Sequence, residues 1–335
     1  MNQTLPQGPP LDIGVPNGGY AWWYLDAISD DGASALTAIV FVGSVFSPWY
    51  FKARQQGAAD PLAHAAINVS IRHQGKLLWV MNERAISPAA RSADSLQLGP
   101  GTRLSWQQGQ LHLTLDEATK PFFQHMPSRL RGSLVLTPLA QHGQVETLDA
   151  GGRHRWCPVA PHARLNVQLD TPGIHFAGKA YHDANWGDEP LEAAFTGWHW
   201  SRAPLQDGTS VCYDTTTLDG SRRALFRSFG RDGTTHVLPA PAQAALPSGK
   251  WGVQRVAATN SGTARVVHTL EDSPFYVRSL VAGDWQGQPA LAVHESLDLQ
   301  RFCAPWVRFL LPFRSRREST VPPPAHLLAT FAPES

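Results

Sequence analysis

The residues best suited to chemistry lie between positions 151 and 202, where histidine, tryptophan, tyrosine and carboxylic acids are dense. Side chains of a β-strand alternate between its two faces. A strand at the start of this stretch would therefore carry His154 and Trp156 on one face, and a second strand would carry Tyr181 and Asp183 on one face. The spacing predicts that two strands direct these four side chains into one interior.

Asp183 carries the strongest chemical signal. A carboxyl group buried beside aromatic rings must be paired or protonated, and an acid kept neutral near pH 7 can donate a proton. The competing interpretation is structural, with Asp183 accepting hydrogen bonds from a turn or an arginine. Structural roles compete for the other three residues as well, because buried Trp, Tyr and His are more often packed or hydrogen-bonded parts of the scaffold. Asp188 and Glu189 precede a proline, so we expect them in a loop, holding turn amides or an arginine.

Aromatic residues are also concentrated near position 20 and near position 200. A large apolar cavity lined with rings is the natural use of so many aromatic side chains, and its ligand would be a hydrophobic chain or a stacked sugar. The candidate substrate-binding residues are Trp22, Trp23, Asn185, Trp198 and Trp200.

Short turn signals such as Asn-Gly, Asp-Gly and Gln-Gly recur along the chain and separate runs of alternating polarity, for example residues 66–72, 111–115 and 163–169. This pattern is typical of β-hairpins at regular intervals. With 28 glycines, 27 prolines and 42% hydrophobic residues, the composition disfavours both disorder and helical bundles. The sequence predicts an all-β protein of antiparallel barrels or sandwiches, with few short helices.

The chain has 335 residues, which is enough for two domains or one large one. Prolines at 158, 161 and 172 bracket one strand and suggest a boundary there. We therefore expect one β-barrel domain over residues 1–165 and a second over residues 166–335, which ends in a tail rich in aromatic and basic residues.

Charge and motifs exclude several classes of protein. The chain has 28 basic and 27 acidic residues, and this balance does not favour nucleic-acid binding, which needs a cationic excess. The signatures of serine hydrolases, zinc proteases and nucleotide-binding enzymes are missing, and three scattered cysteines predict neither a disulfide framework nor a zinc site. The first ten residues do not read as a signal peptide, so a cytoplasmic setting is expected.

Two segments bear on membranes. Residues 32–51 carry no charge, but their Ser, Thr, Gly and Pro content favours two buried strands over a spanning helix. Residues 306–317 mix aromatic side chains with four arginines, which suits either an anionic membrane interface or a packed strand with a solvated basic end.

Four runs carry a family resemblance: GGYAWWYLDAISDDG, TAIVFVGSVFSPWY, GGRHRWCPVAPHARLNV and YHDANWGDEPLEAAFTGWHWSR. Together they resemble the carotenoid 1,2-hydratases of phototrophic bacteria, also called hydroxyneurosporene synthases. The likeness runs from about Gly18 to Trp306. That family is similar in turn to lipocalin-like proteins built from two β-barrels, which agrees with the hairpin pattern.

The resemblance implies a hydro-lyase that adds water across the terminal 1,2 double bond of acyclic carotenoids such as neurosporene and lycopene. The product is a tertiary 1-hydroxy carotenoid, and neither a metal nor an organic cofactor is implied. The catalytic set of the family falls on His154, Trp156, Tyr181 and Asp183, with all four residue types matching. A lipid-soluble substrate further implies a protein attached peripherally to the cytoplasmic side of a membrane.

The chemistry of alkene hydration fits these residues. Protonation of an isolated double bond needs a strong acid, so we expect Asp183 to donate the proton to C2. Trp156 and Tyr181 are expected to stabilise the tertiary cation at C1, with placement of the attacking water as the alternative role for Tyr181. His154 is expected to orient the Asp183 carboxyl and return its proton.

Two other functions remain open on the sequence. A non-catalytic lipocalin-like carrier of an apolar pigment or lipid would share the cavity but would need no inward protonatable acid. A glycan-active enzyme would use Trp stacking and two carboxyls ~5–9.5 Å apart, which Asp183, Asp188 and Glu189 would have to supply.

Overall fold

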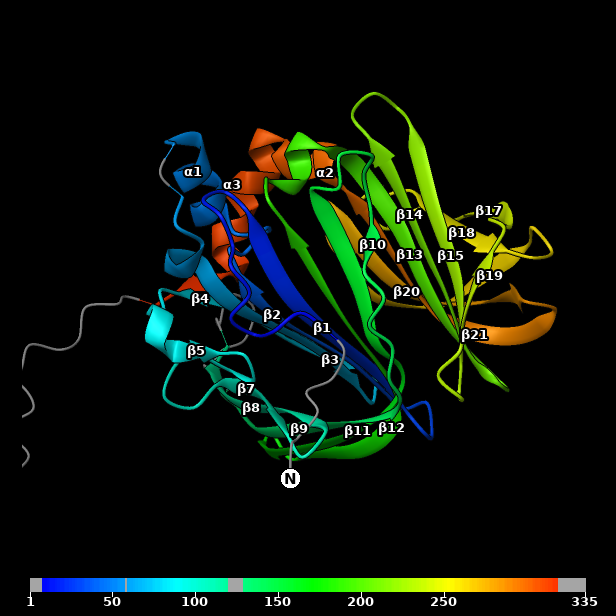
Figure 1. Ribbon diagram of the computed structural model, residues 1–335, viewed down its shortest axis with the longest axis horizontal. Helices are drawn as coiled ribbons and strands as arrows, with labels where there is room; N and C mark the ends of the chain where they lie inside the picture. Colours follow the sequence, from blue (N-terminus) through cyan, green and yellow to red (C-terminus); the bar gives the residue numbers. More distant parts are fainter. Residues whose placement is uncertain (1–7, 58, 120–128, 319–335) are drawn as a thin grey trace, which may run out of the picture.

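The computed structural model describes residues 8–57, 59–119 and 129–318. The chain is mostly antiparallel β-structure, with three short α-helices gathered at one end of the molecule (Figure 1). The predicted all-β class with few short helices is confirmed. Two parts of the predictions lie outside the described residues. They are residues 1–7 and the end of the expected tail, residues 319–335, which includes the Pro-rich segment 322–324.

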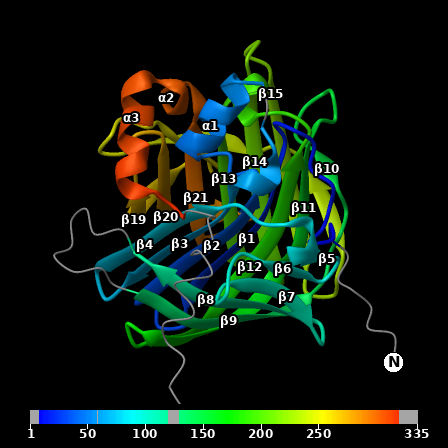
Figure 2. The same ribbon diagram turned by 90° about the vertical axis from the view of Figure 1, so that its left-hand side faces the viewer.

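The first sheet contains thirteen strands among the described residues, in the order β22-β4-β3-β2-β1-β12-β11-β9-β8-β7-β6-β5, and β10 pairs with β11. It curls so that β7 to β9 lie beneath β1 to β4 (Figure 2). Its strands are β1 (Tyr20–Ser29), β2 (Ser34–Val42), β3 (Ala65–His73), β4 (Lys76–Arg84), β5 (Arg91–Ser92), β6 (Ser95–Gln97), β7 (Arg103–Gln107), β8 (Gln110–Ala118), β9 (Arg129–Ala140), β10 (Glu146–Thr147), β11 (His154–Thr171), β12 (Ile174–Gly187) and β22 (Arg316–Arg317).

The second sheet has seven strands within the described ranges, in the order β16-β15-β14-β13-β21-β20-β19, and a two-stranded sheet, β17-β18, lies beside it. These strands are β13 (Phe195–Leu205), β14 (Gly208–Thr217), β15 (Arg222–Gly230), β16 (Thr235–Leu238), β17 (Ala242–Leu246), β18 (Arg255–Thr259), β19 (Ala264–Asp272), β20 (Tyr276–Trp285) and β21 (Gln288–Asp298). The helices are α1 (Pro48–Gln55), α2 (Leu299–Cys303) and α3 (Pro305–Arg314), with 3₁₀ turns η1 (Pro61–His64), η2 (Pro88–Ala90) and η3 (Leu191–Ala193).

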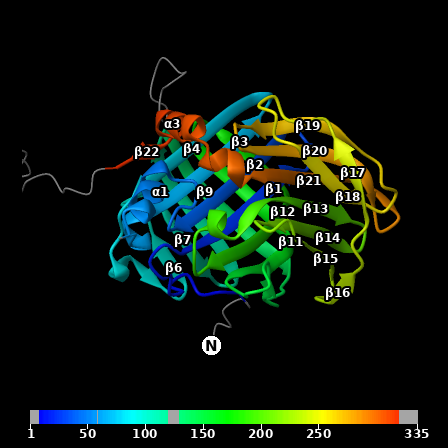
Figure 3. The same cartoon turned by 90° about the horizontal axis from the view of Figure 1, so that it is seen from above.

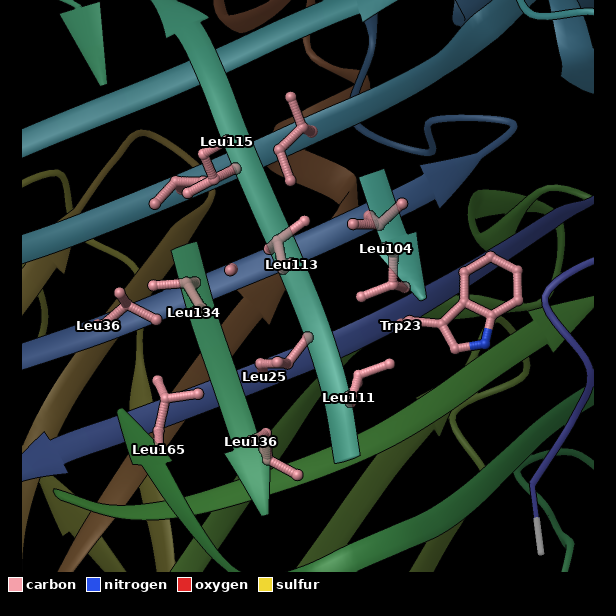
Figure 4. Packing of buried hydrophobic residues seen from close by; sticks show 14 of the residues in the cluster. Trp23, Leu25, Leu36, Leu104, Leu111, Leu113, Leu115, Leu134, Leu136 and Leu165 are labelled. Atoms are coloured by element: carbon pink, nitrogen blue, oxygen red, sulfur yellow. The ribbon is translucent and has the colours of Figure 1, made fainter. Parts of the chain in front are cut away.

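Two apolar cores share strands β1 and β12. Inside the curled first sheet, aliphatic side chains interdigitate, mainly leucines from β1, β2, β7, β8, β9 and β11 (Figure 4). Between the first and second sheets lies a core rich in Trp, Tyr and Phe. Strand β1 is buried along almost its whole length because it contacts both cores: Trp23 and Leu25 face the aliphatic one, whereas Trp22 and Tyr24 face the aromatic one.

The change of sheet does not fall at the expected boundary between residues 165 and 166. That position lies inside β11, which pairs with β12 along one long hairpin, and the chain passes to the second sheet only after Gly187. The prolines at 158 and 161 lie within β11, where the register shifts between Pro158 and Ala160 and between Ala160 and Ala163. Proline is tolerated at such irregularities, so these residues bend a strand rather than link two domains.

Two local predictions need correction. Residues 34–42 form the expected buried strand β2, but the second expected strand is replaced by α1, since Ser47 accepts hydrogen bonds from the amides of Trp49 and Tyr50 and Pro48 occupies the first turn. The 306–317 segment is not a strand along its length, because Pro305 begins α3 and only Arg316 and Arg317 pair with β4. Among the described residues, no helix is long and apolar enough to span a membrane.

Candidate active site

A cavity of about 550 Å³ lies between the two sheets. Its inner wall is built by strands β1, β2, β3, β4 and β12 of the first sheet and by β13, β14, β20 and β21 of the second, and α3 contributes side chains as well. Viewed from above, α3 lies over the end of β2 to β4 (Figure 3). The aromatic side chains that line the inner part are Trp22, Tyr24, Phe41, Trp198, Trp200 and Tyr213.

Asp183 lines this cavity from β12, where it pairs with Tyr24 of β1 and Pro158 of β11. The indole Nε1 of Trp156 and the hydroxyl of Tyr181 each donate a hydrogen bond of 2.7 Å to the same oxygen, Oδ2 of Asp183. The other oxygen, Oδ1, is buried and has no hydrogen-bond partner in the part of the chain that the structure describes. The predicted convergence of these three residues is thus present in the structure.

Burial raises the pKa of Asp183 to about 8, and the hydrogen bonds from Tyr181 and Trp156 only partly oppose this effect. The carboxyl is therefore mostly protonated near pH 7. Because Oδ2 already accepts two hydrogen bonds, the acidic proton belongs on Oδ1. The oxygen that carries the proton is therefore the one that has no hydrogen-bond partner among the described residues.

Trp156 and Tyr181 hold the Asp183 carboxyl from the side that faces away from the cavity. Both are fully buried, and neither is among the described residues that line the cavity. The two rings expected to stabilise a cation thus lie outside the cavity lining, which is formed by other aromatic side chains. The Trp200 ring, for example, packs edge-on against Tyr181 and Tyr24, with centroids 5.2 and 5.6 Å away.

His154 lies apart from Asp183. It pairs with Gly187, four residues farther along β12, which separates the two backbone positions by about 13 Å. The described partners of its ring are the Tyr20 hydroxyl at 2.9 Å from Nδ1 and Glu189 Oε1 at 3.4 Å from Nε2. Burial lowers the pKa of His154. The expectation that His154 holds the carboxyl of Asp183 directly is therefore wrong; it anchors Tyr20, whose ring stacks on Trp22.

Four of the five predicted substrate-binding residues line the cavity: Trp22, Asn185, Trp198 and Trp200. Trp23 does not, because it points from the opposite face of β1 into the aliphatic core (Figure 4). Asp188 and Glu189 form ion pairs with Arg155 and Arg153, as expected of loop carboxylates. Neither is among the described residues that line the cavity, so they do not form there, with Asp183, the carboxylate pair of the glycan-active alternative.

Glu295 on β21 is a second buried carboxyl on the cavity wall, and it is not among the residues predicted from the sequence. Tyr24 donates a 2.7 Å hydrogen bond to Glu295 Oε1, and burial raises the pKa of Glu295 to about 7. Glu295 lies on the same face of its strand as Val293 and Leu297, which belong to the aromatic core. This alternation is the signal in the sequence that could have identified Glu295 as inward-facing. No group of three or more metal-ligating side chains comes together in the described parts of the chain.

The sequence profile of the family described as carotenoid hydratase CrtC matches residues 38–322. This match spans most of the chain and includes Asp183 together with Trp156 and Tyr181, which donate hydrogen bonds to it. The chain belongs to the CrtC carotenoid hydratase family. It is accordingly a hydratase, and the resemblance found in its motifs is confirmed.

Relatives of the family agree with this assignment. The acyclic carotenoid 1,2-hydratase of Thiocapsa roseopersicina is 43% identical over 313 residues, which cover 93% of this chain and 76% of the relative. The enzyme of the same name from Rubrivivax gelatinosus is 42% identical over 315 residues, with the same shares. A crystal structure of an AttH-type protein from Nitrosomonas europaea superposes with a TM-score of 0.58 at 16% identity and covers 89% of this chain and 98% of that one. At this identity the likeness concerns the fold alone, which is lipocalin-like.

Proposed function

We propose that this protein adds water across the terminal C1–C2 double bond of an acyclic carotenoid such as neurosporene or lycopene, with Asp183 as the proton donor. The observation that carries the proposal is a neutral carboxyl in an aromatic cavity, with both hydrogen-bond donors on Oδ2. The named activity of the two similar hydratases supports the same reaction.

In this reaction the proton on Asp183 Oδ1 moves to C2, and the electron pair of the double bond forms the new C–H bond. The resulting tertiary cation at C1 lies among the rings of Tyr24, Trp198 and Trp200. A desolvated cation gains about 2 kcal/mol or more from such a ring. Water then attacks C1, gives the tertiary alcohol and loses a proton. The apolar walls exclude bulk water, which would otherwise take the proton of Asp183 in place of the alkene.

The cavity accommodates one end of the polyene, and the remainder must leave through an opening. Helix α3 lines the cavity with Val307, Leu311 and other apolar side chains, while it exposes Phe309 (69% exposed) and Trp306 (45% exposed). Arginines at 308 and 314 lie on the same helix. An exposed aromatic and basic surface suits an anionic lipid interface, so we propose that α3 docks on the membrane and that the substrate enters beside it.

The test of the reaction is incubation with liposome-dispersed lycopene in heavy-oxygen water, followed by mass spectrometry of the extracted pigment. We expect a product heavier by one labelled water, with an unchanged visible spectrum because the 1,2 bond lies outside the conjugated chain. Unchanged pigment that co-purifies with the protein would contradict the proposal and favour the carrier.

The test of docking is flotation with vesicles that contain phosphatidylglycerol. The double substitution Trp306→Ser and Phe309→Ser should lower the bound fraction at least tenfold, since each buried aromatic side chain contributes about 2 kcal/mol. Val237→Ser is the matched control, because Val237 is equally exposed on β16 of the second sheet. Equal flotation of the double variant and the wild type would exclude α3 as the docking surface.

A further inference from the structure

Among the described residues, two buried carboxyl groups line the cavity, and they come from different sheets. Asp183 belongs to β12 of the first sheet, whereas Glu295 belongs to β21 of the second, where it pairs with Trp200 of β13 and Arg278 of β20. The negative charge of Glu295 contributes to the raised pKa of Asp183, so the two groups are within electrostatic reach. A substrate end in the cavity would therefore lie near two buried carboxyl groups.

Glu295 is held in place by tyrosines. The Tyr24 hydroxyl lies 2.7 Å from Glu295 Oε1 and 3.1 Å from Asp26 Oδ2, and it has one hydrogen to share between these acceptors. Tyr276 also hydrogen-bonds to Glu295. Both hydroxyls favour the ionised carboxylate, and they fix its orientation from β1 and β20.

Charges of both signs surround Glu295. Arg278, fully buried on β20, favours the carboxylate, whereas the carboxyls of Asp26 and Asp183 disfavour it. Asp26 is itself paired with the buried Arg202 of β13, and Glu271 of β19 lies beside Arg278. Burial is the largest influence, and it raises the pKa of Glu295 to about 7. Glu295 is thus divided between its ionised and neutral forms near neutral pH, which is the condition for a proton acceptor that must also release its proton.

We propose that Glu295 is the base that accepts the proton of the attacking water, an inference that rests on the proposed hydration. Asp183 gives its proton to C2, a lone pair of the water oxygen forms the bond to C1, and one hydrogen of that water passes to the Glu295 carboxylate. The alcohol leaves Asp183 ionised and Glu295 protonated. One proton then returns from Glu295 to Asp183 through water, and no other reactant is consumed.

The first test is Glu295→Gln, measured as kcat and KM against pH. The wild type should need Glu295 ionised and Asp183 protonated, which gives a bell-shaped profile with an ascending limb from Glu295. In the variant, kcat should fall about 100-fold and the ascending limb should disappear, while KM changes little. Glu271→Gln is the matched control: it removes a carboxylate from the same sheet, beside the same arginine, and it should keep the ascending limb.

A partial reaction distinguishes the role of Glu295 from that of Asp183. In deuterated water, Glu295→Gln should still protonate the alkene, so deuterium should appear in recovered lycopene through reversal of the first step, while hydration is slow. Asp183→Asn should show neither deuterium exchange nor hydration. Ordinary hydration by Glu295→Gln, or loss of both exchange and hydration in a folded variant, would overturn the role of Glu295.

A milder variant covers the case in which Glu295→Gln fails to fold. Tyr24→Phe keeps the ring but removes a hydrogen bond that favours the carboxylate, so the ascending limb should move to higher pH; an unmoved limb would contradict the assignment. Failure of the wild type to form labelled alcohol would instead contradict the proposed function itself. The two proposals thus fail by different measurements.

Discussion

The two faces of the shared strands β1 and β12 differ in composition and in use. On one face, Trp23 and Leu25 of β1 and Ala184 of β12 join a close-packed aliphatic core. On the other face, Tyr24 and Asp183 line a cavity that holds buried acids. Side chains that are neighbours in the sequence therefore serve different purposes, because each strand presents alternate residues to opposite sides.

This difference shows how the fold can keep a neutral acid in place. Burial of Asp183 and the open cavity are both costly to stability, whereas the leucine core behind the same strands is a source of stability. A rigid core also fixes the backbone from which Asp183, Tyr181 and Trp156 project. Substitutions on the cavity face should consequently lower the rate of hydration, whereas substitutions on the aliphatic face should lower the free energy of unfolding.

The largest effect is expected on the cavity face. Asp183→Asn should lower the rate of hydration by about 10³-fold or more, because the amide cannot supply the proton, while the fold is retained. Steady-state turnover of lycopene and circular dichroism check these two outcomes. Asp188→Asn, which loses only an exposed pair with Arg155, is the matched control and should keep ordinary turnover. Substantial activity in Asp183→Asn would remove Asp183 from the acid role.

The opposite behaviour is expected on the aliphatic face. Leu113→Ala should lower the free energy of unfolding by about 2–5 kcal/mol, since Leu113 is fully buried in a close-packed cluster. Denaturant unfolding measures this loss, and activity per folded molecule should stay within about twofold. A large fall in the activity of the folded fraction would show that the two faces are not separable.

Activity should depend on pH, because Asp183, whose pKa is raised, lies on the cavity face. Activity should fall about tenfold per pH unit above about 8, where Asp183 loses its proton. The folded pKa exceeds the unfolded value of about 3.9, so the folded state binds the proton more tightly and stability should fall as pH rises between these values. Thermal melting of the wild type and Asp183→Asn checks the sign: the variant should gain relative stability toward pH 9. An equal response of both proteins to pH would contradict the assignment.

The smallest and finest contrast is between two adjacent tryptophans. Trp22→Leu should raise KM about fivefold with little change in melting temperature, because Trp22 lines the cavity. Trp23→Leu should cost about 2 kcal/mol of stability with an unchanged KM, because Trp23 packs in the aliphatic core. Kinetics and melting of the two variants form one experiment, and an exchange of their effects would invert the assignment of the faces.

Much of this arrangement could be predicted from local sequence. Alternation along two strands was sufficient to bring Trp156, Tyr181 and Asp183 together, since they belong to one hairpin. The same rule requires Trp22 and Trp23 to point to opposite faces, so only one could line the cavity, and the sequence does not say which. His154 lies on the same face of β11 as Trp156, but it is too far along the hairpin to reach Asp183. This distance depends on the strand register, which alternation does not determine.

Glu295 could not be placed from local sequence. Its position depends on the pairing of β21 with β13 and β20 and on the packing of one sheet over another, which are long-range contacts. Helix α3 was missed for a different reason, because a ten-residue helix with an internal proline has too few turns for a clear period of 3.6. The prolines at 158 and 161, which resemble those of a linker, lie within β11, and the chain passes to the second sheet only after Gly187.

The central claim, a neutral Asp183 as the acid on the cavity face, is tested most directly by infrared difference spectroscopy of wild type against Asp183→Asn. The difference removes the contribution of Glu295 and leaves the carbonyl band of Asp183. The account predicts a protonated carboxyl band at pH 6 that declines with a midpoint near pH 8, the same midpoint as the loss of activity. An ionised Asp183 at pH 6 in an enzyme that hydrates its substrate at that pH would contradict it.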